Sequence, residues 1–214
     1  MKVIQNLVPA SKYNIKCPYL MTPEFIVVHN TANDASAANE VAYMIRNDNQ
    51  VSFHYAVDDK EIVQGIPENR NAWHAGDGTN GRGNRKGLSI EICYSKSGGQ
   101  RFIEAEKLAA KFIAYKLKEK GWGIDKVKKH QDFSGKYCPH RTLDMGWLRF
   151  LDMVKSELDK LKGADKVTDK NTPSSWAKEA WEWAKKEGIL DGTKPKDPVT
   201  REQLAVVLQK VLKK

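Results

Sequence analysis

Three residues of this sequence combine the side-chain types and the spacing of a zinc site. His29 ends a short β-branched run, and His130 lies eight residues before Cys138 in the segment HQDFSGKYCPH. Zinc accepts imidazole nitrogen and thiolate sulfur in tetrahedral geometry, and a catalytic site keeps one of the four positions for water. His29, His130 and Cys138 would form such a three-ligand site. The spacing alone is moderately specific, because one distant ligand and a loop pair can coincide by chance.

One carboxylate, that of Glu91, lies within a segment that is otherwise largely apolar. Glu91 interrupts an apolar strand predicted at Leu88–Tyr94. A carboxylate in such a strand costs free energy unless it is paired or functional. The alternative is an edge strand on which Glu91 faces water.

Strands and helices alternate along residues 1–162, which predicts an α/β domain with a mixed central β-sheet flanked by helices. Alternation along the second strand would place Phe53 and Tyr55 on one face and His54 on the other, which favours a structural role for His54. We expect a hairpin turn at residues 58–60. The predicted strands are Phe25–His29, Phe53–Val57, Glu61–Gln64 and Leu88–Tyr94, and the predicted helices are 36–47 (capped by Asp34 or Ser36), Glu104–Lys120 and Leu143–Lys162.

The pattern changes after residue 162. Residues 163–174 are polar and aperiodic and contain a proline, which predicts a linker. Residues 175–214 predict a small helical hairpin, with Ser175 capping its first helix and a capping box from Thr200 to Gln203 starting its second. A segment this short buries little core, so we expect it to dock on a neighbour or to self-associate.

Composition limits the classes of function. The 214 residues carry 36 Lys and Arg against 27 Asp and Glu, a net charge of +9, which favours a polyanionic partner. No apolar run is long enough to span a membrane, and the N-terminus does not predict a secretory signal. The three cysteines are too few and odd in number for a disulfide framework. Gly76–Gly81 fits G-x-G-x-x-G, but we expect no strand before it and no helix after it, so a dinucleotide site is rejected.

Five sequence blocks resemble, in their order, the zinc-dependent N-acetylmuramoyl-L-alanine amidases of phage endolysins and bacterial autolysins. The likeness covers residues 1–160 and extends to the animal peptidoglycan recognition proteins, and it is greatest for endolysins of phages that infect Bacillus and related Gram-positive hosts. Five blocks in order are far more specific than any one motif. The blocks are VVHNTA (27–32), SFHYAVDD (52–59), AWHAGDG (72–78), LSIEIC (88–93) and HQDFSGKYCPHR (130–141).

The resemblance implies a peptidoglycan hydrolase that cleaves the amide bond between N-acetylmuramic acid and L-alanine through a zinc-activated water. It implies one Zn²⁺ per chain, on the two histidines and the cysteine identified above. Glu91 matches the catalytic glutamate of the family. Lys136 matches a lysine that stabilises the oxyanion in related phage amidases, and the alternative for it is a solvated loop lysine.

Other positions match the family less fully. His74 lies in a groove segment of the family and is expected to bind substrate, with an ordinary loop histidine as the alternative. Some relatives have a catalytic tyrosine where this chain has Phe53, which cannot donate a proton; Tyr55 is kept as a weak substitute. His140 is close to the metal loop in sequence and is a weak candidate for a residue that hydrogen-bonds to a metal ligand.

The implied partner is peptidoglycan, reached from the host cytoplasm without a signal peptide after a holin opens the membrane. Residues 175–214 resemble a shortened S-layer homology motif, so binding of a secondary cell-wall polymer and homodimerisation through the hairpin are the two alternatives for this segment. A host autolysin and a non-catalytic peptidoglycan receptor are the rival functions. Receptors commonly replace the cysteine ligand, which is present here as Cys138, so an enzyme is favoured. No nucleic-acid-binding motif accompanies the basic residues, and neither nucleic acid nor a membrane is an expected partner.

Overall fold

The computed structural model describes residues 1–168, 173, 177–195, 197 and 199–212. The chain divides into two compact units, Met1–Leu161 and Lys162–Lys214. None of the helices in the described residues is long and apolar enough to cross a membrane.

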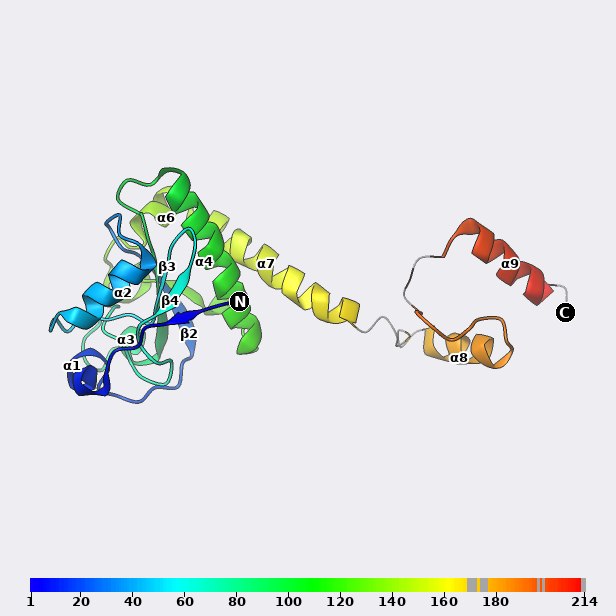
Figure 1. Ribbon diagram of the computed structural model, residues 1–214, viewed down its shortest axis with the longest axis horizontal. Helices are drawn as coiled ribbons and strands as arrows, with labels where there is room; N and C mark the ends of the chain where they lie inside the picture. The colour runs from blue at the N-terminus through cyan, green and yellow to red at the C-terminus, as the bar shows by residue number, and fades with distance from the viewer. Residues whose placement is uncertain (169–172, 174–176, 196, 198, 213–214) are drawn as a thin grey trace. The chain divides into compact units, whose positions relative to one another are not determined.

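The first unit is built on a six-stranded mixed sheet in the order β1-β4-β3-β5-β2-β6. Figure 1 shows strands of this sheet between α2 (Ala37–Arg46) and α4 (Gly99–Glu119). Only β3 and β4 pair antiparallel, and all the other neighbours are parallel. This confirms the predicted α/β class. The strands are β1 (Ile4–Gln5), β2 (Phe25–Asn30), β3 (Tyr55–Val57), β4 (Ile62–Gln64), β5 (Gly87–Ile92) and β6 (Val127–Lys129).

Helices cover both faces of this sheet. On one face, Phe112 of α4 packs its ring edge-on against Tyr55 of β3 at 4.9 Å between centroids. On the other face, α2 packs over β3 and β4, where Val41 and Met44 are buried. Central strands covered on both sides are nearly continuous apolar runs, and every residue of β2 is buried, including the polar His29 and Asn30 at its end.

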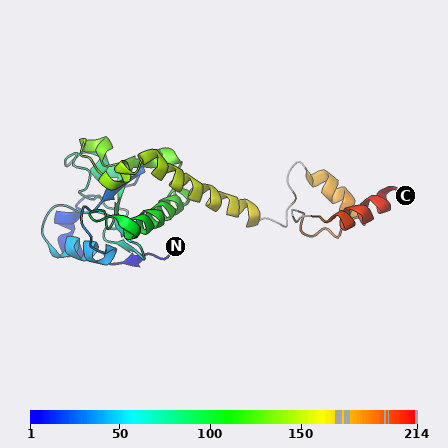
Figure 2. The same cartoon turned by 90° about the horizontal axis from the view of Figure 1, so that it is seen from above.

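The remaining helices are short or flank α4. Arg149 of α7 donates to Glu106 of α4 at 2.7 Å, and Figure 2 shows the two helices side by side. The helices of this unit are η1 (Ala10–Lys12), α1 (Tyr13–Lys16), α2 (Ala37–Arg46), α3 (Arg82–Lys86), α4 (Gly99–Glu119), η2 (Ile124–Lys126), α5 (Gln131–Ser134), α6 (His140–Asp144) and α7 (Trp147–Thr168). Helix α7 continues beyond Leu161, the last residue of the unit.

Several boundaries differ from the sequence prediction. The expected helix 143–162 is two helices, α6 and α7, because Gly146 between them has φ +104° and breaks the helical path. Helix α7 ends at Thr168, inside the segment 163–174 expected to be a linker. The G-x-G-x-x-G segment does lead into a helix, the five-residue α3, contrary to expectation. No β-strand immediately precedes that segment, so the rejection of a dinucleotide site stands.

The second unit contains α8 (Lys178–Lys186) and α9 (Arg201–Leu212). The predicted capping box is present, since Gln203 N donates to Thr200 Oγ1 at 3.2 Å and Thr200 N donates to Gln203 Oε1 at 2.8 Å. The predicted cap at Ser175 lies outside the described residues. Within the described part of this unit, only Ala184 and Ile189 are buried hydrophobic residues.

Candidate metal centre and catalytic groove

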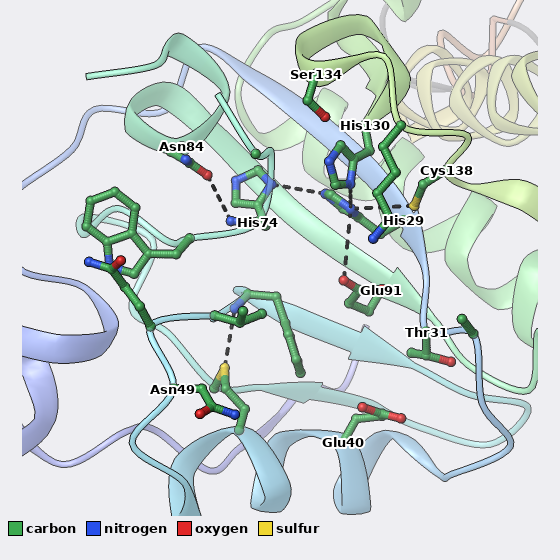
Figure 3. Close-up of a pocket in the computed structure, with 18 of the residues that line it drawn as sticks. His29, Thr31, Glu40, Asn49, His74, Asn84, Glu91, His130, Ser134 and Cys138 are labelled. Atoms are coloured by element: carbon green, nitrogen blue, oxygen red, sulfur yellow. Dashed lines mark hydrogen bonds and ion pairs between the residues drawn. The ribbon is translucent and has the colours of Figure 1, made fainter. Parts of the chain in front are cut away.

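The candidate site lies in a cavity of about 760 Å³ at the carboxyl ends of three neighbouring parallel strands, β5, β2 and β6 (Figure 3). His29 and Glu91 are register partners on β2 and β5, so both side chains point into the same cavity. His130 directly follows β6, and its backbone N–H donates to Val28 O at 3.3 Å. Ligands bind at this edge of parallel sheets because the strand ends are held rigidly side by side.

The structure brings the three predicted metal ligands together. Nδ1 of His29 lies 3.0 Å from Nδ1 of His130 and 3.8 Å from Sγ of Cys138. All three side chains are buried, and their ligand atoms lie within 4.8 Å of one another. Two imidazoles and one thiol at this spacing are a donor set that fits a tetrahedral metal with one position left over. The described residues can therefore hold one metal ion here.

Asn30 joins the strand ligand to the loop ligand. Its Oδ1 accepts hydrogen bonds from the backbone N–H groups of Arg141 at 3.0 Å and Thr142 at 3.2 Å, at the start of α6. These bonds fix the start of α6, and with it the Cys138 loop, against the end of β2. Asn30 was not among the predicted site residues; its signal was an amide side chain directly after His29 at the end of a buried strand.

His74 lines the cavity, but its ring also contacts a metal ligand. Its Nδ1 lies 3.0 Å from Nε2 of His29, and this hydrogen bond turns Nδ1 of His29 toward His130 and Cys138. A partner on the second ring nitrogen is the usual way in which a ligating histidine is oriented. His74 is thus placed to orient His29, a geometry that the expectation of substrate contact did not include.

The backbone of His74 is itself held by Asn84. Asn84 Oδ1 accepts from the N–H groups of His74 and Ala75, both at 2.8 Å. Asp77 in turn accepts from Gly83 N at 2.6 Å and from Asn84 N at 3.2 Å, which fixes the first turn of α3. The short helix therefore serves to position the histidine loop, and the sequence analysis assigned no role to it or to Asn84.

Glu91 points at the metal ligands and has an unpartnered oxygen. Its Oε1 is 3.9 Å from Nδ1 of His29, and its buried Oε2 has no hydrogen-bond partner within the described part of the chain. Burial, reinforced by the nearby Glu40 carboxylate and opposed by Lys136, raises the pKa of Glu91 to about 8. A carboxyl group with a pKa near neutrality can both accept and donate a proton.

Lys136 lines the same cavity and supplies its positive charge. This charge opposes the rise in the pKa of Glu91. It also opposes the rise in the pKa of Cys138, which burial and the Glu91 carboxylate bring to about 11. His140 is placed elsewhere, because its Nε2 lies 3.3 Å from the carbonyl oxygen of Ser95.

The expectation for Tyr55 was wrong. Phe53 lines the cavity, whereas Tyr55 lies against α4 and its hydroxyl donates to Glu68 at 2.7 Å. Strand β3 begins only at Tyr55, so the alternation of faces does not extend back to Phe53. The expected structural role of His54 holds: its Nδ1 accepts from Ser89 N at 3.0 Å, and its Nε2 donates to a backbone carbonyl at 2.9 Å.

One wall of the cavity is the loop 47–51 that follows α2. Lys16, whose side chain is fully buried, donates to Asn47 Oδ1 at 2.9 Å, to Val51 O at 3.2 Å and to Asn49 O. Three acceptors satisfy all three donors of an ammonium group, which is what makes its burial tolerable. Lys16 therefore holds the loop 47–51 in place through these three hydrogen bonds.

A family model described as N-acetylmuramoyl-L-alanine amidase matches residues 19–141. The chain is 54% identical over 218 residues to N-acetylmuramoyl-L-alanine amidase CwlA of Bacillus subtilis, covering 99% of this chain and 79% of that protein. It is 58% identical over 178 residues to N-acetylmuramoyl-L-alanine amidase XlyB of the same organism, covering 83% of this chain and 55% of that protein.

Solved structures agree with these matches. The structure of PlyL is 55% identical with a TM-score of 0.70, covering 72% of this chain and 97% of that chain. The solution structure of the PlyG catalytic domain is 54% identical with a TM-score of 0.70, covering 74% and 96%. The family match spans more than half of the chain and includes all three of the clustered histidine and cysteine side chains; this chain belongs to the N-acetylmuramoyl-L-alanine amidase family.

Proposed function

We propose that this protein hydrolyses the amide bond between N-acetylmuramic acid and L-alanine in peptidoglycan, with Zn²⁺ held by His29, His130 and Cys138. The observation that carries the proposal is the set of three buried ligand atoms within 4.8 Å of one another, beside Glu91, whose buried Oε2 has no hydrogen-bond partner in the described residues. The names of the Bacillus relatives support the same bond and the same substrate.

The donor set suits zinc, because a thiolate with two imidazoles favours this metal over the oxygen-seeking Mg²⁺ and Ca²⁺. When bound, Zn²⁺ polarises the amide carbonyl and lowers the pKa of water to roughly 7. His74 keeps the ring of His29 in the orientation that presents Nδ1 to the metal. One ion per chain follows from one cluster in the described residues.

The protein side chains then handle the protons and the charge. Glu91 accepts a proton from the attacking water and delivers it to the leaving nitrogen, which its buried position beside His29 allows. Lys136 provides positive charge where the carbonyl oxygen becomes negative, an effect on the order of 2.7–4 kcal/mol by analogy with oxyanion-hole donors. Phe53 contributes no proton, so Glu91 carries both transfers.

Hydrolysis of purified Gram-positive peptidoglycan, followed by the appearance of new N-terminal alanine, tests this proposal. Activity that disappears with a chelator and returns with zinc supports both the reaction and the metal. Binding without cleavage would indicate a peptidoglycan receptor. Cleavage that is indifferent to the chelator would mean that other residues perform the chemistry. Steeply salt-dependent DNA affinity without zinc dependence would indicate a DNA-associated basic protein instead.

The setting of this activity is also part of the proposal. We infer a phage or prophage endolysin of a Gram-positive host that is made in the host cytoplasm and reaches the wall after holin-dependent release, with a host autolysin as the alternative. The net charge of +9 suits a wall rich in anionic polymer.

For residues 175–214 we propose binding of a secondary cell-wall polymer, with homodimerisation as the alternative. Exposed apolar residues on α9, among them Leu204 and Leu208, support a role in contact with another molecule. Light scattering of the purified chain gives its oligomeric state, and a pull-down on purified walls gives its retention. A monomer that is retained on walls supports polymer binding and excludes the dimer.

A further inference from the structure

The cavity contains a second polar cluster beyond Glu91, which the proposed chemistry does not use. Thr31 Oγ1, Glu40 Oε1 and Glu91 Oε2 are buried oxygens without a hydrogen-bond partner in the described residues, and all three side chains line the cavity. Figure 3 shows Glu91 between His29 and Glu40, with Thr31 beside this end of the cavity. The side chain of Glu40 is 9% exposed.

Two elements hold this cluster in place. Thr31 directly follows β2, where its N–H donates to Ile92 O at 3.2 Å, and the next residue, Ala32, adopts a left-handed conformation with φ +58°. Glu40 lies in the first turn of α2, which Ser36 caps by accepting from Asn39 N at 3.3 Å. A carboxylate in the first turn of a helix is favoured by the helix dipole, which helps to offset its burial.

Oε1 of Glu40 is a buried acceptor that lacks a hydrogen-bond donor in the described residues. A buried acceptor without a partner costs about 1–3 kcal/mol, and more when it is charged. No ion pair joins Glu40 to a basic side chain in the described part of the chain. The Glu40 side chain lines the cavity, so a small rotation of its carboxylate would turn this oxygen toward a bound substrate, which can supply the missing donor.

We propose that Glu40 and Thr31 form a subsite that accepts N–H groups of the stem peptide on the far side of the scissile bond, beyond L-alanine. The inference rests on the proposed function. If Glu91 delivers a proton to the leaving nitrogen, that nitrogen lies beside Glu91. The peptide attached to it then extends away from the metal ligands, toward Glu40 and Thr31 on the other side of Glu91. Carboxylate and hydroxyl oxygens are acceptors, and successive peptide N–H groups are the donors that this peptide carries.

Matched substrates of different peptide length test the subsite. Glu40→Gln should lower kcat/KM for an N-acetylmuramoyl pentapeptide about tenfold, mainly through KM, which is the loss expected for one hydrogen bond to a charged acceptor. For N-acetylmuramoyl-L-alanine, which does not reach the subsite, the same variant should show only the change that follows from removing the Glu40 charge beside Glu91, so the loss on the pentapeptide should exceed it about tenfold. Thr31→Val should show the same dependence on peptide length with a smaller effect.

Glu104→Gln is the matched control, since Glu104 is exposed on α4 away from the cavity and should leave both substrates unaffected. Equal losses on both substrates would overturn the inference and would assign Glu40 an effect on Glu91 alone. Losses that follow glycan length at constant peptide length would overturn it in favour of sugar hydroxyls.

Calorimetric binding of the free stem peptide separates the subsite from the hydrolysis. Weaker binding to the Glu40→Gln protein than to the wild type supports the subsite even if the wild type cleaves neither substrate, an outcome that would sink the proposed reaction alone. Equal binding of the peptide to both proteins overturns the subsite. Equal thermal midpoints for the two proteins show that the comparison is made between folded chains.

Discussion

The two units of this chain bury their apolar residues very differently. In the first, a sheet and the helices on both faces enclose side chains such as Ile26, Phe112 and Phe150, which are fully buried. In the second, α9 has no buried residue, and the side chains of Leu204 and Leu208 are about half exposed, at 47% and 49%. A capping box and an amphipathic pattern are enough to specify a helix, but they do not supply the partner that covers it.

The chemistry follows the same division. Every residue of the candidate metal centre and groove belongs to the first unit, where strand ends and helix caps hold the side chains from several directions. A site that depends on ångström-scale placement needs such a rigid frame. The second unit is suited instead to contacts made by exposed side chains.

The largest expected effect tests the contrast in packing. Phe150→Ala, which removes a fully buried ring of α7, should lower the free energy of unfolding of the first unit by about 3–5 kcal/mol. Leu208→Ala on α9 should change stability by less than about 0.5 kcal/mol, because the side chain is already half exposed. Calorimetric unfolding of both variants measures the difference. Similar losses for the two would show that α9 has a packing partner.

The second prediction concerns where the chemistry resides. Cys138→Ser should reduce hydrolysis at least about 100-fold, because a metal ligand should matter more than the groups that hydrogen-bond to metal ligands, whose loss costs about 10–100-fold. Bound zinc should fall below one ion per chain by elemental analysis. Cys17→Ala is the control, since Cys17 is also a buried free cysteine but lies outside the cluster, and it should retain its zinc. A fully active Cys138→Ser protein would remove this residue from the site.

A smaller effect is expected from an ion cluster within the first unit. Burial alone would raise the pKa of Glu68, but hydrogen bonds from Lys120, Lys116 and Tyr55 outweigh it and lower the pKa to about 2. The folded pKa lies below the unfolded value of about 4.3, so this carboxylate stabilises the fold above that pH, and the contribution is lost as the pH falls toward 2. Glu68→Gln should cost on the order of 1–2 kcal/mol at pH 7 and almost nothing at pH 2.

Chemical denaturation from pH 7 to pH 2 follows this difference between wild type and Glu68→Gln. A loss that stays constant with pH would mean that the charge of Glu68 is not what stabilises the cluster. Glu104→Gln again serves as a control, because its side chain is exposed and its partners among the described residues belong to its own helix.

The smallest expected effect is that of removing the second unit. A chain ending at Thr168 keeps the whole of α7 and should show the same thermal midpoint for the first unit and the same hydrolysis of soluble muropeptides. Retention on purified walls should decrease if residues 175–214 anchor the protein. Unchanged retention would remove the anchoring proposal, and reduced muropeptide hydrolysis would show that the second unit contributes to the chemistry of the first.

Features set by local sequence were predictable. The apolar run of β2, the long helix α4 and the capping box of α9 depend on neighbouring residues, and all three are present. The family resemblance, carried by five ordered blocks, is confirmed by the match over residues 19–141. The break between α6 and α7 was missed because a glycine in a helical pattern shows its positive φ only in the folded chain.

The supporting residues of the site were the least predictable. Asn30 and Lys16 act through hydrogen bonds to partners far away in sequence, such as Arg141 for Asn30, whereas Asn84 holds the backbone of a loop nine and ten residues before it. Their residue types are common in loops and carry no spacing signal. Tyr55 was misplaced for a related reason, since the start of β3 is set by its pairing with β4 and β5 and not by its own residues.

The anchoring of the groove wall by Lys16 has a consequence for how this protein can change. Two of its three acceptors are main-chain carbonyls, those of Asn49 and Val51, so the anchor does not depend on the side chains at those positions. Residues 49–51 line the cavity, and other side chains at these positions leave the backbone anchor to Lys16 in place. We expect libraries varied at these three positions to yield folded enzymes with an altered preference among peptidoglycans, so that recognition changes without loss of stability.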